Sequence, residues 1–293
     1  DVDGVHFDDY FYPYPDGSPF PDDATRQEYV DGGGTLSLGD WRRQNVHDMV
    51  EAVHLGIEAA RPDVRFGISP FGIYRPGMPE GITGLDQYES IYSDPLVWID
   101  EGWVDYLAPQ LYWPSTQTQQ AYAPLLAWWA EQTSGGRYIF PGNFLSKLGS
   151  DASWDVEEFL VQIELTRAQR EMGAMGNIFF HIAPLAADQD GVATAFVDEF
   201  YDTPVLTPAI AAHLDDVVEP PWVELAGDTA TLVPGDDQRL RAWVVYEDLG
   251  AGWELGELVP ATTTEVSLGT GRWAVSAVAR TGAESLGTVV EVP

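Results

Sequence analysis

The sequence contains no cysteine among its 293 residues and only one lysine, Lys147. The absence of cysteine excludes disulfide bonds and every metal site that depends on thiolate ligands. No run of about 18 consecutive apolar residues occurs, so no membrane insertion is expected. No signal peptide is visible in the sequence either.

Positive charge is scarce throughout the chain. There are 14 basic residues against 47 acidic ones, which gives a formal net charge of -33. A chain this acidic repels nucleic acid and anionic membranes, so we expect neither as a partner. The acidic residues are spread out, which favours a halophilic surface, adapted to high salt, over a disordered acidic tail. A cationic ligand such as calcium is the alternative explanation of the charge.

The motifs of several other enzyme classes are missing. The sequence has no Gly-x-Ser-x-Gly elbow and no His-Glu-x-x-His metal motif. The glycines at 32–34 are not followed by the Lys-Ser/Thr of a phosphate loop. The segment 188–191 resembles the middle of a calcium loop, but Ala186 and Val197 occupy its first and last ligand positions. We therefore predict no metal site and no cofactor.

Over roughly the first 200 residues, short apolar strands alternate with amphipathic helices, which predicts parallel βα units. The expected strands are 2–7, 64–69, 104–111, 137–141 and 177–182. The expected helices are 40–60 with Asp40 as its N-cap, 95–101, 118–133, 155–172 and 192–200. These five units are fewer than the eight of a closed barrel. The pattern alone fits either an open doubly wound sheet or the last five units of a (β/α)₈ TIM-type barrel.

After about residue 204 the helical periodicity stops. Prolines at 220 and 221 mark a stiff, non-helical stretch that is typical of a linker. Alternating strands separated by glycine-containing turns follow, at 240–246, 264–268, 272–279 and 287–292. We therefore expect an α/β domain over 1–203, a linker over 204–217 and a small all-β sandwich over 218–293.

The first strand ends in the most promising group of side chains. Functional residues gather at the C-terminal ends of parallel strands, and His6, Asp8 and Tyr10 share one face there by strand alternation. Carboxylates can protonate a glycosidic oxygen or attack the anomeric carbon, and aromatic rings can stack on sugar rings. We predict Asp8 as the catalytic carboxylate with Asp9 second. The alternative is that these aspartates only cap the loop.

Other candidates for substrate binding stand near helix and strand ends. Arg43 lies at a helix N-terminus, where a cation is unfavourable, so it either pairs a site carboxylate or substrate anion, or forms a surface ion pair. A buried Gln110 needs hydrogen-bond partners, which a ligand or the backbone could supply. The full set of substrate-binding candidates is His6, Tyr10, Tyr12, Arg43, Ser69, Tyr74, Arg75, Gln110, Tyr112, Trp113, Asn143, Lys147 and His181.

Four segments, 2–13, 40–46, 66–75 and 105–113, together resemble the bacterial glycosyl hydrolase-like 10 family. The resemblance covers roughly residues 1–200. It implies an extracytoplasmic glycosidase with a (β/α)₈ barrel, often followed by a fibronectin type III-like domain. It also implies that the first strand here is the fourth barrel strand, so that the sequence is a fragment starting partway through the barrel. The sequence departs from the family pattern around Lys147 and at His181, which predicts altered sugar subsites.

Taken together, the residues and the resemblance predict hydrolysis of O-glycosidic bonds in a polysaccharide or cell-wall glycan. Gln110 and Tyr112 would orient sugar hydroxyls, and Tyr12, Tyr74 and Trp113 would form stacking platforms. The second carboxylate is either the neighbour in the Asp8–Asp9 pair or a residue upstream. The alternatives are a non-catalytic carbohydrate-binding or scaffolding protein and an inactive fragment of a longer hydrolase. The sequence does not predict the oligomeric state.

Overall fold

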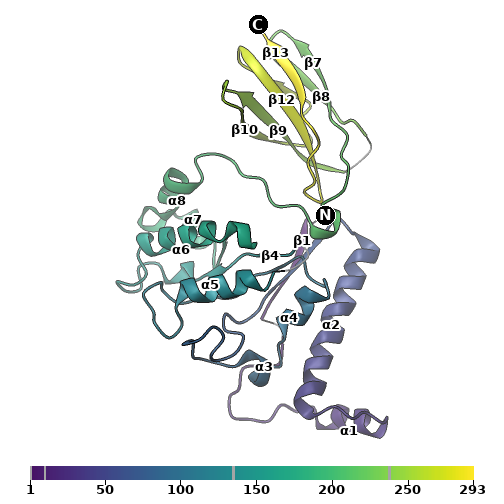
Figure 1. Cartoon of the computed structure of the whole chain (residues 1–293), viewed down its shortest axis with the longest axis vertical. Coiled ribbons are helices and arrows are strands. Elements are labelled where there is room, and N and C mark those ends of the chain that lie inside the picture. Colours follow the sequence, from purple (N-terminus) through teal and green to yellow (C-terminus); the bar gives the residue numbers. More distant parts are fainter. Residues whose placement is uncertain (1, 10, 134–135, 237–238) are drawn as a thin grey trace. The chain divides into compact units, whose positions relative to one another are not determined.

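The computed structural model describes residues 2–9, 11–133, 136–236 and 239–293. The chain divides into two compact units, Val2–Ala195 and Phe196–Pro293 (Figure 1). The first unit contains both helices and strands, and the second is built mainly of strands. This confirms the predicted mixed α/β content. Within the described residues, no helix combines the length and apolar character needed to span a membrane.

The first unit is built on parallel strands that pair in chain order. Four of them form one sheet in the order β1-β2-β3-β4, and β5 and β6 form a parallel pair. Gln110 forms parallel bridges with Phe71 on one side and with Gly142 on the other, so the strand ends continue the same order. The strands are β1 (Gly4–Asp8), β2 (Arg65–Ser69), β3 (Tyr106–Leu107), β4 (Tyr138–Ile139), β5 (Gly142–Asn143) and β6 (Ile178–Phe179).

All but the last two helices lie between these strands along the chain, and the last two follow β6. They are α1 (Asp23–Asp31), α2 (Leu38–Ala60), α3 (Gln87–Ser90), α4 (Pro95–Asp100), α5 (Tyr122–Glu131), α6 (Val156–Ala168), α7 (Ala183–Ala186) and α8 (Val192–Phe200). Helix α2 begins before the predicted Asp40, because the Ser37 side chain caps it by accepting a hydrogen bond from the Asp40 amide. Asp40 is therefore inside the first turn and is not the N-cap.

The core of the first unit surrounds β2, whose five residues are all buried. Burial of a strand on both faces is expected when helices cover a parallel sheet. Trp98 of α4 and Trp129 of α5 are fully buried in the same core cluster as Ile68. Strands β3 and β4 are shorter than predicted. Pro109 and Pro141 follow them, and proline cannot donate to a strand ladder.

The second unit contains two antiparallel sheets, with strand orders β10-β9-β12-β13 and β11-β8-β7. Side chains from both sheets, including Leu232, Trp243 and Val275, form one core. The strands are β7 (Trp222–Ala226), β8 (Thr229–Val233), β9 (Leu240–Asp248), β10 (Trp253–Pro260), β11 (Glu265–Ser267), β12 (Gly271–Ala279) and β13 (Thr288–Val292).

The stretch that we expected to be a linker, 204–217, belongs to this compact second unit. Ile210 is only 2% exposed, and its amide donates to the Thr281 carbonyl at 2.7 Å. A short 3-10 helix, Ala211–His213, follows. Ile210 is therefore packed within its own unit and is anchored by a backbone hydrogen bond to the turn that follows β12.

Candidate active site

Two carboxylates stand at the C-terminal end of β1. Asp8 is the last residue of the strand and is exposed. Asp9 follows with a φ of 61°, in the left-handed region, which aspartate tolerates better than most residues. The left-handed residue ends the extended strand and begins the loop. The two carboxyl groups are close enough for the charge of Asp8 to raise the pKa of Asp9.

Gln110 supports Asp8 from the end of β3, which β2 separates from β1 in the sheet. Its Nε2 donates to Asp8 Oδ1 at 3.1 Å and reaches the Ser69 carbonyl at 3.4 Å. The parallel bridges of Gln110 to Phe71 and Gly142 fix its backbone. The structure therefore brings together two residues that the sequence predicted separately, although they are 102 positions apart.

Asp9 has a different environment from Asp8. Burial raises the pKa of the Asp9 carboxyl, a hydrogen bond from the Tyr14 hydroxyl lowers it, and the charge of Asp8 raises it again, with a net upward shift. The Tyr14 hydroxyl donates to Asp9 Oδ1 at 2.9 Å. A carboxyl group with a raised pKa keeps its proton to higher pH, as a general acid must.

Aromatic side chains line the surroundings of the carboxylates. Burial and the charges of Asp8 and Asp9 raise the pKa of the Tyr112 hydroxyl, so this hydroxyl lies near both carboxylates. The Tyr112 ring stacks on Phe144, with 4.6 Å between ring centroids, and lies 6.1 Å from the Phe180 ring. Aromatic rings and a phenolic hydroxyl suit the mixed apolar and polar surface of sugars.

Two further aromatic rings, those of Phe71 and Trp113, lie close to Tyr14. The Phe71 ring meets Tyr14 at 6.3 Å and Trp113 at 5.8 Å between centroids, both edge to face. Edge-to-face contacts of this kind hold aromatic side chains in defined orientations. Trp113, a predicted stacking platform, therefore stands in the same aromatic group as Tyr14.

His6 and Ser69 brace the strand ends behind Asp8. The two ring nitrogens of His6 bond to the Ser69 hydroxyl at 2.9 Å and to the Tyr106 hydroxyl at 3.0 Å. Partial burial lowers the pKa of His6, although the charge of Asp8 opposes the shift. Both nitrogens are thus engaged within the protein, which makes His6 a support for the site. Tyr10, predicted beside it, lies outside the described residues.

The predicted residues Tyr12 and Arg43 are held by structural partners. The Tyr12 hydroxyl accepts a hydrogen bond from Asn45 at 3.1 Å, and its ring packs against Phe20 and Tyr92. These contacts anchor the loop. Arg43 is 7% exposed. Its guanidinium donates to Asp40 at 2.7 Å and to the Tyr88 carbonyl at 2.8 Å, which corresponds to the ion-pair alternative for Arg43.

Tyr74, Arg75 and Asn143, which we also predicted to contact substrate, have partners within the protein. Tyr74 is buried, donates to Asp94 at 3.1 Å and stacks on Trp128. Arg75 pairs with Asp86 and Glu89 at 3.4 Å. Asn143 is fully buried, and its amide nitrogen donates to Tyr122 and Gln162 at 2.9 and 2.6 Å. Their partners are distant in sequence, so spacing alone could not identify these supporting roles.

Lys147 and His181 lie at the aromatic edge of the site. The Lys147 ammonium is 5.6 Å from the centroid of the Phe144 ring. His181 lies 5.7 Å from the Phe180 ring, and its Nδ1 accepts a hydrogen bond from the Ala183 amide at 3.2 Å. Because Phe144 and Phe180 both contact Tyr112, the two predicted residues border the same group of rings.

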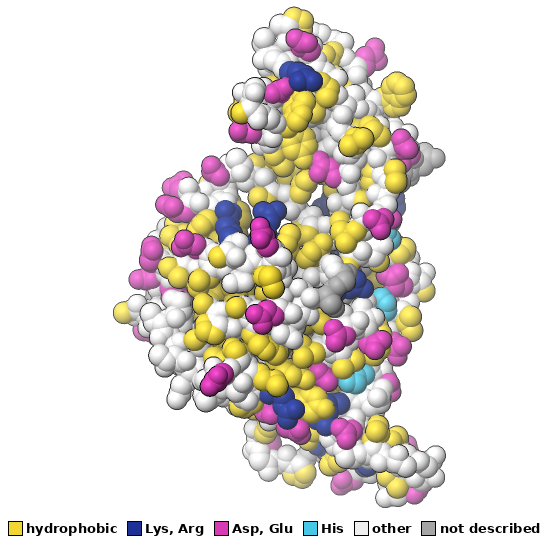
Figure 2. Space-filling model, in the orientation of Figure 1, with side chains coloured by type: hydrophobic (Ala, Val, Ile, Leu, Met, Phe, Trp, Pro, Cys, Tyr) yellow, Lys and Arg dark blue, Asp and Glu magenta, His cyan; other side chains and the backbone are white. Residues whose placement is uncertain are grey.

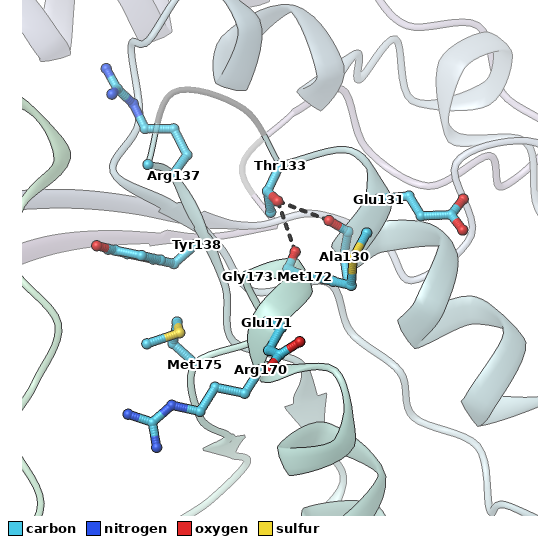
Figure 3. A pocket seen from close by; sticks show the side chains of 11 residues that line it. Ala130, Glu131, Thr133, Arg137, Tyr138, Arg170, Glu171, Met172, Gly173 and Met175 are labelled. Atoms are coloured by element: carbon cyan, nitrogen blue, oxygen red, sulfur yellow. Dashed lines mark hydrogen bonds between the residues drawn. The ribbon is translucent and has the colours of Figure 1, made fainter.

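A hollow of about 440 Å³ lies elsewhere in the first unit, near the start of β4 (Figure 3). Arg137, Tyr138 and Arg170 stand around it, and Arg137 donates to the carbonyls of Gly102 and Val104. Ligand sites of parallel sheets form at the carboxyl ends of strands, whereas β4 only begins here. We therefore place the candidate active site at Asp8 and Asp9 and not at this hollow.

Comparison with known proteins places this geometry in a family. Residues 1–150 match the family model described as glycosyl hydrolase-like 10. The chain is 37% identical over 219 residues to glycosyl hydrolase YngK of Bacillus subtilis, which covers 71% of this chain and 42% of that protein. It is 33% identical over 209 residues to glycosyl hydrolase DigH of Escherichia coli K12, covering 67% and 47%.

The chain spans less than half the length of these curated relatives. Among solved structures it is similar to bee venom hyaluronidase in complex with a hyaluronic acid tetramer. That similarity has a TM-score of 0.33 and 17% identity over 50% of this chain and 47% of the other, which is too low to support an argument. The match to the family model, in contrast, covers half of the chain. The chain therefore belongs to the glycosyl hydrolase-like 10 family.

Proposed function

We propose that this protein hydrolyses O-glycosidic bonds in a polysaccharide or cell-wall glycan, and that Asp8 and Asp9 carry the reaction. One observation carries the proposal. Two adjacent carboxylates stand at the C-terminal end of β1 with different partners, since Asp8 accepts a hydrogen bond from Gln110 and Asp9 accepts one from Tyr14. Burial, which raises the pKa of Asp9, suits that carboxyl group to hold the proton of a general acid.

The two carboxylates then have distinct roles. Asp9 holds a proton and donates it to the oxygen of the leaving sugar. Asp8 is the ionised partner that activates water or attacks the anomeric carbon. An ionised carboxylate acts only as an acceptor, which agrees with the hydrogen bond that Gln110 donates to Asp8. Tyr112 and Trp113 offer a hydroxyl and a ring face to the sugar, and Lys147 with His181 would border a neighbouring subsite.

The architecture proposed for this function has two parts. The parallel strands, paired in chain order, are consistent with βα units of a (β/α)₈ barrel that supplies the site. The two antiparallel sheets of the second unit are consistent with a fibronectin type III-like domain that acts as a spacer. An extracytoplasmic location is proposed from the resemblance to the family alone.

The proposal is tested by replacing each carboxylate with its amide. Asp8→Asn and Asp9→Asn should each lower glycan turnover by at least about 10²-fold, because an amide can neither supply the proton nor act as the base. Glycan affinity should change only a few-fold. Asp48→Asn is the matched control, because Asp48 is an exposed residue of α2 and its replacement should leave turnover unchanged.

Two outcomes would contradict the proposal. Full turnover in both amide variants would exclude Asp8 and Asp9 from the chemistry. A wild-type protein that binds glycans through its aromatic cluster but never cleaves them would instead favour the non-catalytic binding protein.

A further inference from the structure

Tyr14 stands on a loop that is stiff for reasons visible in the sequence. It lies between Pro13 and Pro15. Each proline fixes its own φ, and the residue before a proline is restricted to extended conformations. The loop is also anchored just before this point, because the Tyr12 amide donates to the Ile91 carbonyl at 3.3 Å. The backbone therefore holds the Tyr14 side chain in a narrow range of positions.

The Tyr14 side chain is fixed at both its ring and its hydroxyl. The ring meets the edge of Phe71, and the hydroxyl donates to Asp9 Oδ1 at 2.9 Å. Phe71 is also the bridge partner of Gln110, which donates to Asp8 Oδ1. Each proposed catalytic carboxylate thus accepts a hydrogen bond on one oxygen. Both donor residues contact Phe71, since Tyr14 packs on its ring and Gln110 is its bridge partner.

A donor on one oxygen decides where a carboxyl proton sits. A protonated carboxyl group carries one proton, and the oxygen that accepts a hydrogen bond from Tyr14 is then the carbonyl-like one. Since the Tyr14 hydroxyl occupies Oδ1, the acidic proton of Asp9 is left on Oδ2. The hydrogen bond from Tyr14 thus distinguishes the two oxygens of the Asp9 carboxyl group.

We propose that Tyr14 is a positioning residue that keeps the proton of Asp9 on Oδ2 and thereby selects the oxygen that protonates the substrate. This inference rests on the proposed function, because it assigns the acid to Asp9. Tyr14 itself touches Asp9 and not the reacting bond.

The titratable groups around Asp9 determine in which direction its pKa changes when a neighbour is replaced. They are Asp8 at the end of β1, Tyr14 on the loop and Tyr112 after β3. The Tyr14 hydrogen bond lowers the pKa of Asp9 and the charge of Asp8 raises it. Removing the Tyr14 hydroxyl must therefore raise the pKa of Asp9, and removing the charge of Asp8 must lower it.

The test measures the titration of the Asp9 carboxyl carbon by NMR in Tyr14→Phe, Tyr112→Phe and Asp8→Asn. We expect a rise of about 0.5–1 pH unit in Tyr14→Phe, the effect of one lost hydrogen bond, and a fall in Asp8→Asn. Tyr112→Phe is the matched control, because Tyr112 lies near Asp9 but no hydrogen bond joins the two among the described residues. Tyr14 is 45% exposed, so its replacement by phenylalanine should not disturb the fold.

The kinetic part of the test separates positioning from a merely structural role. In Tyr14→Phe, kcat on a cleaved glycan should fall about tenfold with KM little changed. The basic limb of the pH–rate profile should move upward by the same amount as the Asp9 titration. An unchanged Asp9 titration would overturn the proposal, and so would a shifted titration with unchanged kcat and pH profile.

Failure of the proposed function would look different. In that case the amide variants of Asp8 and Asp9 would not lower turnover, or the wild-type protein would show none. The titration in Tyr14→Phe would still decide whether the hydroxyl holds Asp9, while the assignment of Asp9 as the acid would fall.

Discussion

At the scale of the residue, the candidate site depends on side chains that orient its carboxylates by hydrogen bonds. Gln110 is the clearest example, because its amide joins Asp8 to the end of β2. The glutamine was predictable, since a polar residue at the end of an apolar strand needs a partner. Tyr14 was not predicted, because its position follows from a proline-bound loop and not from strand alternation. The prolines on either side of it were the signal that could have found it.

Replacing Gln110 tests this supporting role. Gln110→Leu should lower kcat by about 10-fold to 10²-fold, because Asp8 loses the donor that orients it, and the Tm should change little. Gln117→Leu is the control, since Gln117 is exposed and its side chain donates to the nearby Gln120. Equal activity of the two variants, measured on one glycan, would show that Gln110 does not orient a working carboxylate.

At the scale of the element, a buried polar network ties the loop after β3 to α6 and β5. Glu158 accepts hydrogen bonds from the Ser115 amide and hydroxyl at 2.6 and 2.7 Å, and from Gln162 at 2.6 Å. Gln162 in turn accepts from Asn143. Asn143 precedes Phe144, the ring on which Tyr112 stacks. The network therefore sets the position of the aromatic wall of the site.

Gln162 is the residue through which this network is connected. Gln162→Leu should lower the free energy of unfolding by about 2–3 kcal/mol, because it leaves buried donors and acceptors without partners. Glu164→Leu, at an exposed position of the same helix, should change it by no more than about 0.5 kcal/mol. Urea unfolding followed by tryptophan fluorescence measures both. A loss no larger in Gln162→Leu than in the control would contradict the account of the network.

The elements themselves were largely predictable, and their ends were not. Apolar runs located most strands and most longer helices of the first unit, because burial fixes the pattern of side chains. They did not predict α1, which has no buried residue. Strand β3 is shorter than its apolar run because Pro109 interrupts the ladder. Helix α2 begins earlier than predicted because Ser37 provides the cap. Contacts between residues far apart in the chain, such as Asn143 with Gln162, leave no trace in local spacing.

At the scale of the whole molecule, charge is the dominant feature. Figure 2 shows acidic side chains scattered over the visible face, with few basic ones between them. The formal net charge of -33 destabilises a compact state through self-repulsion. Salt shortens the range of this repulsion from about 10 Å at ~0.1 M to about 3 Å at ~1 M. The acidity is consistent with the proposed adaptation to high salt.

This charge makes a direct prediction about stability. Raising KCl from ~0.1 M to ~1 M should increase the Tm by several degrees, because repulsion between the carboxylates is screened. Differential scanning calorimetry at constant pH measures the change, and sucrose at equal osmolality controls for effects other than charge. A Tm that stays constant or falls with KCl would contradict an important role for self-repulsion.

The central claim is that the carboxylates at the end of β1 hydrolyse glycosidic bonds. The most direct measurement is incubation of the protein with a panel of polysaccharides in ¹⁸O-labelled water, followed by mass spectrometry of the products. The account predicts new reducing ends that carry one ¹⁸O atom with the wild-type protein, and their loss in Asp9→Asn. Glycans that remain intact with the wild-type protein, or equal labelling with Asp9→Asn, would contradict it.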